Sequence, residues 1–417
     1  MAKEDTKTNK FDVAVIGAGP AGLISAFQAA RNGLRVVLIE KNSAFGKKFL
    51  LTGGGRCNLT NAEFDLRKLA ENYNNGEFLF HAFSVFGPKE TIEFFEKLGI
   101  KTKTENNKRV FPKNQDAKQI LETFKKYLTE NRVEILLNSE ILDFEKKAGN
   151  ITKIILKSGE ISAKQYILAT GGKSYSKTGS DGFGYQLAEK LGHKIEKPTP
   201  ALSPIMLKEE WIKNLQGLSL ADIQINVFQN NKKQFSEQGE ILFTHYGLTG
   251  PAALNISGKV ESLLEKGEVK IIMDLFPLLN QELLLEGLEK DLKKYPKQTI
   301  KNILSVFVPE RMAGAVLDIA KIDKNKIANN ISKVERAEIV KTLKNIELTA
   351  QEVFGFEAAM VTKGGISLKE IDHKTMQSKI IKNLSFAGEI LDVDGKTGGF
   401  NLQLCWSSGY IAGQNCK

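Results

Sequence analysis

The chain has 417 residues, 41% of them hydrophobic and 26% charged, and its formal net charge is +10. This length and composition are typical of an ordinary globular protein with two or three domains. The absence of an apolar run of about 18 residues argues against a membrane-spanning helix. Three cysteines without a CxxC pair argue against a disulfide framework or a cysteine metal site. We therefore expect a cytoplasmic protein with reduced thiols, no membrane partner and no metal.

The positive net charge raises the question of a nucleic-acid partner, because clustered Lys and Arg bind phosphates. Here the basic residues are spread along the chain with acidic residues between them, even in the densest stretches at 101–113 and 289–301. Such spacing is typical of a solvated surface. We expect a small-molecule substrate and no nucleic acid, and the sequence indicates no particular oligomeric state.

The first predicted element is a strand at 11–16 that runs directly into a glycine-rich turn. Gly17 permits the tight turn, Gly19 lets the backbone approach a pyrophosphate, and Gly22 lets the following helix pack closely on the sheet. Backbone N–H groups at the start of that helix then face the phosphates. The spacing predicts a dinucleotide-binding Rossmann unit.

A second predicted strand, at 35–39, ends in Glu40. This acid lies roughly the expected ~20 residues beyond the glycines, where a carboxylate accepts hydrogen bonds from a ribose diol. The two strands together therefore predict that an adenine dinucleotide binds here.

A signal peptide is the alternative interpretation of this region, because Lys3, Lys7 and Lys10 precede a fairly apolar stretch. Asp12, Pro20 and three glycines interrupt that stretch, and no small-residue cleavage site stands out. The nucleotide interpretation is therefore preferred.

Helical and strand-like patterns alternate through the rest of the first part of the chain, after a run of three glycines at 53–55. The periodicity predicts helices at 88–98 and 116–131, and strands at 133–138, 140–145, 151–157 and 165–170. Together with the nucleotide-binding unit, these elements predict one α/β domain, whose first part is residues 1–197.

The pattern changes near the prolines at 198 and 200. Strand-like stretches follow at 223–228, 241–244 and 269–274, and residues 279–345 have the apolar spacing of helices. Sheet-like sequence returns at 354–366, a strand follows at 384–387, and a last helix opens at 398–401. We therefore predict an insert at 198–355, with a β part and a helical subdomain, and a return to the first domain at 356–417.

Several runs of the chain match one family. These are residues 17–22, 52–58, 109–112, 169–172, 242–251, 361–365, 375–379 and 387–401. On these runs the chain resembles the BaiN-like, aminoacetone-oxidase-like FAD-dependent oxidoreductases of the glutathione-reductase-type flavoprotein fold. The resemblance covers nearly the whole chain. It implies an α/β fold in which a Rossmann-like FAD-binding domain is interrupted by an insert with a barrel-like β part and a helical part.

One segment departs from the family pattern. After Gly172 the family commonly has a proline and a Gly-Asp-Gly, and this chain instead continues with the residues 174–184. The departure leaves open the shape of this loop and its contacts with a substrate.

The resemblance implies FAD as the cofactor, bound by residues from both ends of the chain. The predicted FAD-binding residues are Gly17, Ala18, Gly19, Pro20, Ala21, Gly22, Glu40, Lys41, Lys48, Thr52, Gly53, Gly54, Gly55, Arg56, Cys57, Asn58, Ile141, Thr170, Gly171, Gly388, Glu389, Gly399, Asn401 and Leu402.

Glu389 is the second predicted cofactor acid, because an acid at this strand end in similar flavoproteins accepts a hydrogen bond from a ribityl or phosphate-side hydroxyl. Gly388 beside it allows close approach. Gly399 and Asn401 would begin the last helix with unpaired N–H groups and a positive dipole end toward the flavin N1 and C2 carbonyl, which stabilises reduced flavin. A glycine C-cap or a plain loop is the alternative for either run alone.

The loop at 53–58 is the other predicted cofactor contact, because three glycines let the backbone lie against a planar ring or pyrophosphate, and Arg56 and Asn58 can hydrogen-bond it. A flexible hinge is the alternative for the glycines. Cys57 is either a thiol beside the flavin or a small buried hydrophobic residue, and it has no partner cysteine for a dithiol pair.

The catalytic candidates are Arg56, Cys57 and His245. His245 lies in a polar Thr-His-Tyr run and is the best of the four histidines for proton transfer. A packed or capping histidine is the alternative interpretation.

No second strand-GxGxxG-helix unit is found, so NAD(P)H, a candidate transient electron donor, has no dedicated Rossmann site. The leading prediction is an oxidoreductase that reduces a small molecule through flavin N5 with NAD(P)H, an electron-poor alkene being one acceptor. The alternatives are an FAD-dependent amine oxidase that uses dioxygen, an RNA-modifying flavoprotein, and a flavin-bearing scaffold without turnover.

Overall fold

The computed structural model describes residues 10–417, so Lys3 and Lys7 lie outside the described residues. The chain divides into two compact units, each with its own hydrophobic core. One unit contains the described residues up to Ala201 together with Phe356–Lys417, and the other is Leu202–Gly355. No helix among residues 10–417 is long and apolar enough to cross a membrane.

A largely parallel sheet forms the centre of the first unit. Five parallel strands lie in the order β6 (Glu134–Leu136), β2 (Val36–Ile39), β1 (Lys10–Ile16), β9 (Gly159–Leu168) and β18 (Leu384–Phe386). β7 (Ile141–Lys147) and β8 (Asn150–Leu156) extend the sheet as antiparallel strands beside the first part of β9. The chain builds outward from β1 in both directions, and ligands of such sheets bind where the strand order reverses, at the carboxyl ends of the strands.

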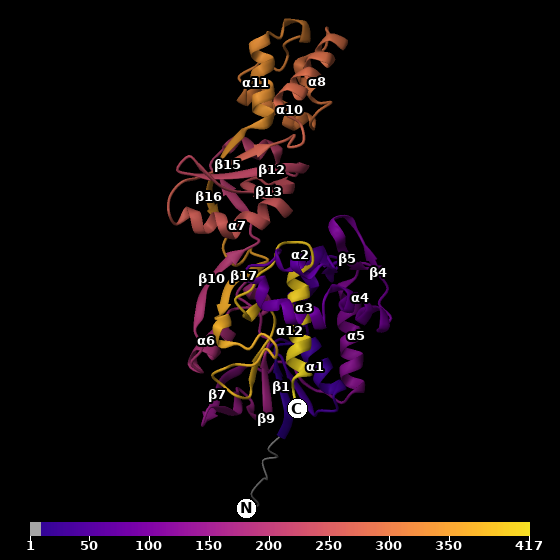
Figure 1. Cartoon of the computed structure of the whole chain (residues 1–417), viewed down its shortest axis with the longest axis vertical. Helices are drawn as coiled ribbons and strands as arrows, with labels where there is room; N and C mark the ends of the chain where they lie inside the picture. The colour runs from indigo at the N-terminus through magenta and orange to yellow at the C-terminus, as the bar shows by residue number, and fades with distance from the viewer. Residues whose placement is uncertain (1–9) are drawn as a thin grey trace, which may run out of the picture. The chain divides into compact units, whose positions relative to one another are not determined.

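Two helices from opposite ends of the chain pack together on this sheet. These are α1 (Pro20–Arg31) and α12 (Phe400–Gln414), which lie side by side in Figure 1. A Cβ atom added to Gly409 would lie 2.4 Å from the Ala21 carbonyl oxygen, and the Ser25 hydroxyl donates to the Gly409 carbonyl oxygen at 2.9 Å. The missing side chain therefore lets the last helix approach the nucleotide-binding helix closely.

Smaller elements complete the first unit. The helices are α2 (Leu66–Ala70), α3 (Phe80–Val85), α4 (Pro88–Lys97), α5 (Ala117–Glu130) and α6 (Phe183–Lys190). The remaining strands are β3 (Thr60–Asn61), β4 (Thr102–Thr104) and β5 (Arg109–Pro112), which form a small sheet, and the antiparallel pair β10 (Ile195–Ala201) and β17 (Val361–Ile366).

The second unit is a closed six-stranded barrel with helices. Its strands are β11 (Ile205–Leu207), β14 (Gly247–Thr249), β13 (Lys232–Phe243), β12 (Ser219–Gln229), β15 (Val269–Asp274) and β16 (Ile346–Val353) in barrel order. Helix α7 (Pro251–Leu264) packs on the barrel. The helical part contains α8 (Gln281–Lys294), α9 (Ile300–Leu304), α10 (Glu310–Ile319) and α11 (Lys333–Lys344). The predicted α/β fold with a barrel-like and helical insert is confirmed.

Two details differ from the sequence pattern. The strand predicted at 354–366 is wrong in its first half, because β16 ends at Val353 and β17 begins at Val361. Residues 354–360 instead carry the chain out of the barrel. The prolines at 198 and 200 lie inside β10, which tolerates them because it pairs only with β17 and shifts register between Glu196 and Thr199.

Candidate active site

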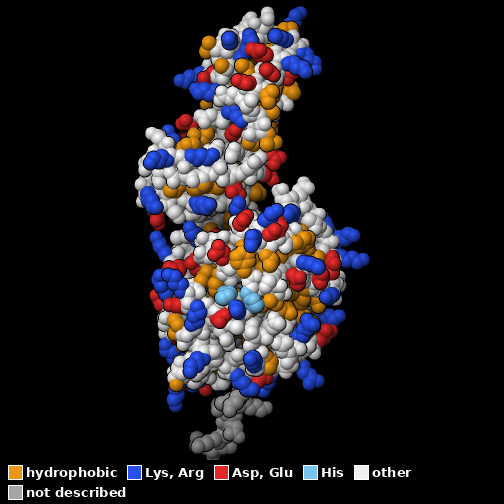
Figure 2. Space-filling model, in the orientation of Figure 1, with side chains coloured by type: hydrophobic (Ala, Val, Ile, Leu, Met, Phe, Trp, Pro, Cys, Tyr) orange, Lys and Arg blue, Asp and Glu red, His pale blue; other side chains and the backbone are white. Residues whose placement is uncertain are grey.

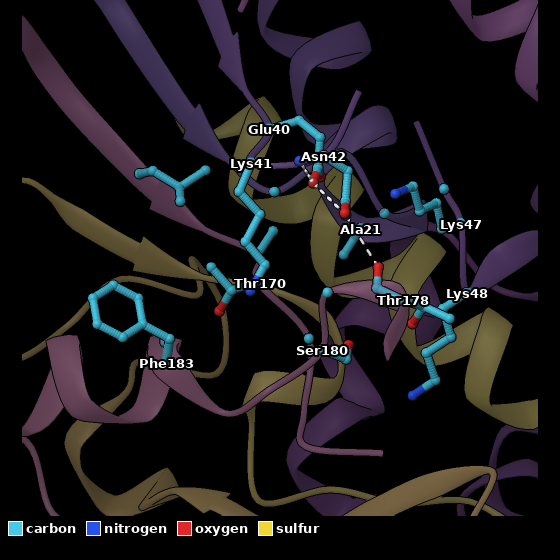
Figure 3. Close-up of a pocket in the computed structure, with 18 of the residues that line it drawn as sticks. Ala21, Glu40, Lys41, Asn42, Lys47, Lys48, Thr170, Thr178, Ser180 and Phe183 are labelled. Carbon is cyan, nitrogen blue, oxygen red and sulfur yellow. Dashed lines mark hydrogen bonds between the residues drawn. The ribbon is translucent and has the colours of Figure 1, made fainter. Parts of the chain in front are cut away.

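A cleft opens at the carboxyl ends of β1, β2 and β9, where the sheet topology places ligands. Its volume is about 1130 Å³, part of it open to solvent. Gly17 follows β1, Glu40 follows β2 and Thr170 follows β9, and all three line the cleft. Figure 3 shows Glu40 and Thr170 among the side chains around it.

The three glycines after β1 differ in what surrounds them. A Cβ atom on Gly17 would lie 2.5 Å from the Ala169 carbonyl oxygen, and one on Gly22 would lie 1.8 Å from the Gly17 carbonyl oxygen. A Cβ atom on Gly19 would meet nothing within 4 Å. Gly17 and Gly22 are therefore required by packing, whereas the backbone at Gly19 faces the open cleft.

Glu40 links the ends of the first two strands. Its Oε2 accepts a hydrogen bond from the Ala18 N–H at 2.8 Å, and its Oε1 accepts from the Asn42 N–H and side-chain amide, each at 2.8 Å. Glu40 is buried, with 8% of its surface exposed. Because an ionised carboxylate has about four lone-pair positions, it retains acceptor capacity for ligand hydroxyls.

Thr170 supplies a polar atom that the fold does not use. Its Oγ1 is buried and has no hydrogen-bond partner among the described residues. Buried hydroxyl groups are rarely left unpaired, since burial without a hydrogen bond costs free energy. Thr170 lines the cleft, so this hydroxyl fits a polar ligand there.

Lysines and a second acid line the part of the cleft near β18. Lys48 Nζ lies 2.7 Å from Glu389 Oε2 and 2.7 Å from the Ser174 hydroxyl. Glu389 Oε1 also accepts the Thr362 N–H at 2.9 Å. Lys41, Lys47 and Lys48 all line the cleft. Lys41 and Lys48 are paired with Asp181 and Glu389, so the exposed Lys47 is the lysine best able to pair with a phosphate.

Residues 178–181, here called the strap, also line the cleft. Asn42 donates from its amide to the Thr178 carbonyl oxygen at 3.0 Å, and Lys41 forms an ion pair with Asp181 at 2.7 Å. Figure 3 shows Asn42 between Glu40 and Thr178, with hydrogen bonds to both. The strap belongs to the segment that departs from the family pattern, and the sequence did not predict its place at the cleft.

The loop at 53–58 is fixed by contacts within the protein. The Arg56 guanidinium pairs with Glu105 at 3.0 Å and stacks over the Phe111 ring at 4.0 Å. Cys57 is fully buried, and burial raises the pKa of its thiol well above the usual range. A thiol with a raised pKa is a poor nucleophile, so the geometry favours the small buried residue over a reactive thiol.

The loop at 53–58 meets the start of α12. The Asn58 amide donates to the carbonyl oxygens of Val110 and Thr60 and accepts the Gly399 N–H at 3.0 Å, in the orientation that pairs both of its atoms. Asn401 does not project toward a ligand, because its amide bonds both the N–H and the carbonyl oxygen of Gly395. The two predicted flavin segments thus lie together, while the side chains of Asn58 and Asn401 serve the fold.

His245 lies in the second unit, in the turn between β13 and β14, and it is exposed. Its ring contacts the Tyr246 ring at 4.6 Å. Its predicted catalytic role stays a prediction.

The cleft gathers part of the predicted set. Predicted residues that line it are Gly17, Gly19, Pro20, Ala21, Glu40, Lys41, Lys48, Ile141, Thr170, Gly171 and Glu389. Ala18 and Gly22 support the turn; Thr52, Gly53, Gly54, Gly55, Arg56, Cys57 and Asn58 form the second loop; and Gly388, Gly399, Asn401 and Leu402 lie before and at the start of α12. Cleft residues missed from the sequence include Asn42, Gly46, Lys47, Ser139, Thr178, Ser180, Asp181 and Cys405. Among residues 10–417, no group of three or more His, Cys, Asp or Glu side chains is arranged to hold a metal.

Comparison with known proteins identifies the family of this chain. Residues 11–415 match the family described as HI0933-like protein Rossmann domain. The chain belongs to the HI0933-like family. It is 31% identical over 408 residues to a 3-dehydro-bile acid delta(4,6)-reductase of Clostridium scindens. The alignment covers 96% of this chain and 98% of the relative.

A second relative of this HI0933-like chain carries a different name. It is a ribosomal RNA dihydrouridine synthase of Haemophilus influenzae, 33% identical over 401 residues, with 95% of this chain and 96% of the relative covered. Among solved structures, a 3-ketosteroid delta1-dehydrogenase of Sterolibacterium denitrificans superimposes with a TM-score of 0.53 at 12% identity, over 97% of this chain and 99% of that chain. That likeness shows a common fold.

The predicted resemblance to this group of oxidoreductases is confirmed, and the HI0933-like chain is a flavin-dependent oxidoreductase. The absence of a nucleic-acid partner stays a prediction, because one relative is named for ribosomal RNA. On the face of the molecule in Figure 2, basic and acidic side chains are interspersed.

Proposed function

We propose that this chain binds FAD in the cleft and uses NAD(P)H to reduce a carbon–carbon double bond of an electron-poor small molecule. Glu40 accepts from the adenosine ribose, the backbone at Gly19 approaches the pyrophosphate, and the Thr170 hydroxyl pairs with the cofactor. Glu389 then accepts from a hydroxyl on the ribityl side, and Lys47 pairs with a phosphate oxygen.

The glycine turn at residues 17–22 has both packed and open positions, and this contrast supports the assignment of the cofactor. Gly17 and Gly22 are enclosed by backbone atoms, Gly19 faces free space, and the unpaired Thr170 Oγ1 lines the same cleft. The glycine turn and the cleft beside it therefore fit a dinucleotide. Bound FAD supplies hydride transfer through its N5 atom.

The names of the two full-length relatives support an alkene as the substrate class. One is a delta(4,6)-reductase and the other makes dihydrouridine, and both names denote reduction of a carbon–carbon double bond. A double bond accepts hydride when an electron-withdrawing group polarises it. NAD(P)H is proposed as a donor that docks transiently, since the sequence contains one dinucleotide fingerprint.

The test is anaerobic addition of NADH or NADPH to the purified protein while the oxidised flavin absorption band is followed. We expect rapid bleaching, followed by recovery of the band when an electron-poor alkene is added. A bound flavin that stays oxidised with both nicotinamides contradicts the proposal. In that outcome amine oxidation becomes the leading function, and small amines under air are tested next.

RNA modification is a second candidate, favoured by the 33% identity to a ribosomal RNA dihydrouridine synthase over nearly its whole length. Phosphate contacts make RNA binding weaken steeply with salt. Tight, salt-sensitive binding of ribosomal RNA fragments, with dihydrouridine formed in them, would favour this candidate. The interspersed charges on the face seen in Figure 2 argue for the small molecule.

A further inference from the structure

An acidic residue stands on the loop that joins the two C-terminal parts of the candidate site. Asp394 lies between Glu389, which lines the cleft, and Gly399, which begins α12 beside the glycine-rich loop. The loop is therefore anchored at both ends by segments assigned to the cofactor. Asp394 does not line the cleft itself, but it lies close enough to Glu389, which does, for the Glu389 charge to raise the pKa of Asp394.

The backbone on each side of Asp394 is pinned. The Asn74 N–H donates to the Asp394 carbonyl oxygen at 2.8 Å, and the Lys396 N–H donates to the Asn72 carbonyl oxygen at 2.9 Å. Asn401 bonds both backbone groups of Gly395, at 2.8 and 2.7 Å. The fold thus uses the backbone of this loop and keeps its position rigid.

The Asp394 carboxyl group, by contrast, is only partly used. Its Oδ1 has no contact with solvent and no hydrogen-bond partner among the described residues. A buried oxygen without a hydrogen bond costs free energy of folding. Proteins retain such atoms at functional sites.

The charges that face Asp394 come from three elements. Lys363 of β17 favours the ionised form, whereas Asp392 and Glu389 disfavour it, and the Asn74 side chain donates a hydrogen bond. Burial is the largest influence and raises the pKa of Asp394 to about 6. A carboxyl group with this pKa exchanges its proton near neutral pH.

We propose that Asp394 is the proton donor of the reduction, an inference that rests on the proposed function. The hydride that originates from NAD(P)H adds to one carbon of the substrate double bond, and Asp394 gives its proton to the other. Two C–H bonds form, the double bond becomes single, and NAD(P)H is oxidised to NAD(P)⁺. Asp394 is left as a carboxylate and regains its proton from water.

Neighbouring groups fit this role less well. Burial also raises the pKa of Asp392 to about 6, so the pKa does not distinguish the two acids. Asp392 differs in its contacts, because its Oδ2 accepts a hydrogen bond from the Asn75 amide at 3.3 Å and its N–H donates to the Ile366 carbonyl oxygen of β17. Cys57 is fully buried and its raised pKa keeps it a thiol. Asp394 combines a fixed backbone with an unused oxygen.

The test compares the wild type with Asp394→Asn and the control Asp392→Asn. The visible spectrum of bound, oxidised FAD is recorded between pH 5 and 8, because a carboxyl group that titrates beside the flavin shifts its absorption. We expect a step near pH 6 in the wild type. Because the pKa of Asp392 is raised to a similar value, the step is assigned with the double variant Asp392→Asn/Asp394→Asn, in which it should be absent. In Asp392→Asn the step should persist at lower pH, because the Asp392 charge raises the pKa of Asp394. A wild-type spectrum that does not change with pH, a step that is lost in Asp392→Asn, or a step that survives in the double variant overturns the proposal.

A second readout separates this proposal from the proposed function. Anaerobic bleaching by NADPH should be unchanged in Asp394→Asn, while reoxidation by 2-cyclohexen-1-one should slow by roughly 100- to 10,000-fold, the usual contribution of an acid catalyst. If NADPH does not bleach the flavin band of the wild type, the proposed function itself is contradicted. Equal reoxidation rates in the wild type and Asp394→Asn contradict the role of Asp394 alone. If the wild type does not react with this alkene, the pH-dependent spectrum decides.

Discussion

Glu40 Oε2 accepts the backbone N–H of Ala18 at 2.8 Å, so the acid that ends β2 is tied directly to the glycine turn that follows β1. The same carboxylate also fixes Asn42, which reaches the strap at Thr178. Three walls of the cleft are therefore connected through one side chain. A site that is ordered in advance loses less entropy when its ligand binds.

Glu40→Gln should weaken FAD binding, because the amide removes acceptor capacity from both the ribose and the Ala18–Asn42 contacts. A hydrogen bond to a charged group is worth about 1.5–3 kcal/mol, which corresponds to roughly a 10- to 150-fold rise in Kd. Fluorescence titration of FAD-free protein with FAD measures it. The control is Glu122→Gln on the exposed face of α5, and equal affinities for the two variants would count against the assigned role of Glu40.

Gly19→Ala and Gly22→Ala should separate binding from folding. A Cβ atom at Gly22 would press on the Gly17 carbonyl oxygen, so Gly22→Ala should destabilise the protein by about 1–3 kcal/mol or more. At Gly19 the added methyl group meets no protein atom, so thermal unfolding of the FAD-free protein should be unchanged while FAD affinity falls. Unchanged FAD affinity in Gly19→Ala would show that the cofactor does not approach this backbone.

Asp181→Asn should release FAD faster, because it removes the ion pair that fastens the strap to Lys41. Both side chains are partly exposed, so the pair is worth about 0.2–1 kcal/mol and the rate should rise by no more than about fivefold. Stopped-flow displacement of FAD measures the rate. The difference between the variant and the wild type should shrink at high salt, which screens exposed ion pairs, and a difference independent of salt would speak against this cause.

Asp394→Asn should change how stability depends on pH. Burial raises the pKa of this carboxyl group from 3.8 to about 6, so the folded state binds a proton that the unfolded state has lost. The contribution of that proton to the free energy of unfolding has its full value below about pH 4 and is lost as the pH rises through 6. Above pH 7 the asparagine variant should be more stable relative to the wild type than at pH 4, by up to about 3 kcal/mol. Urea unfolding at both pH values measures it, and a constant difference contradicts the burial of this carboxyl group.

The parts of the fold that the sequence predicted are those with a strong local pattern. Strand β1, its glycine turn and Glu40 obey rules of spacing that act within a few residues. The change to a barrel and helices was visible because alternating and helical periodicities differ. The end of β16 was missed because apolar residues at 354–360 look strand-like, although no neighbouring strand pairs with them.

The parts of the site that were missed depend on contacts between distant segments. The strap at 178–181 carries polar and glycine residues with no periodic pattern, and its role depends on Asn42 and Lys41, more than 130 residues earlier in the chain. Asn401 was assigned to the cofactor from its motif, and its amide is instead bonded to Gly395. Neither the partner of an amide nor the unpaired Thr170 hydroxyl is visible before the chain is folded.

The central claim is that FAD binds in the cleft at the ends of β1, β2 and β9, and amide hydrogen exchange with and without FAD tests it most directly. We predict slower exchange in peptides that cover residues 17–22, 40–48 and 169–181, and little change in those from the barrel strands β12 and β15. FAD binding that leaves the exchange of all three cleft segments unchanged would contradict the account.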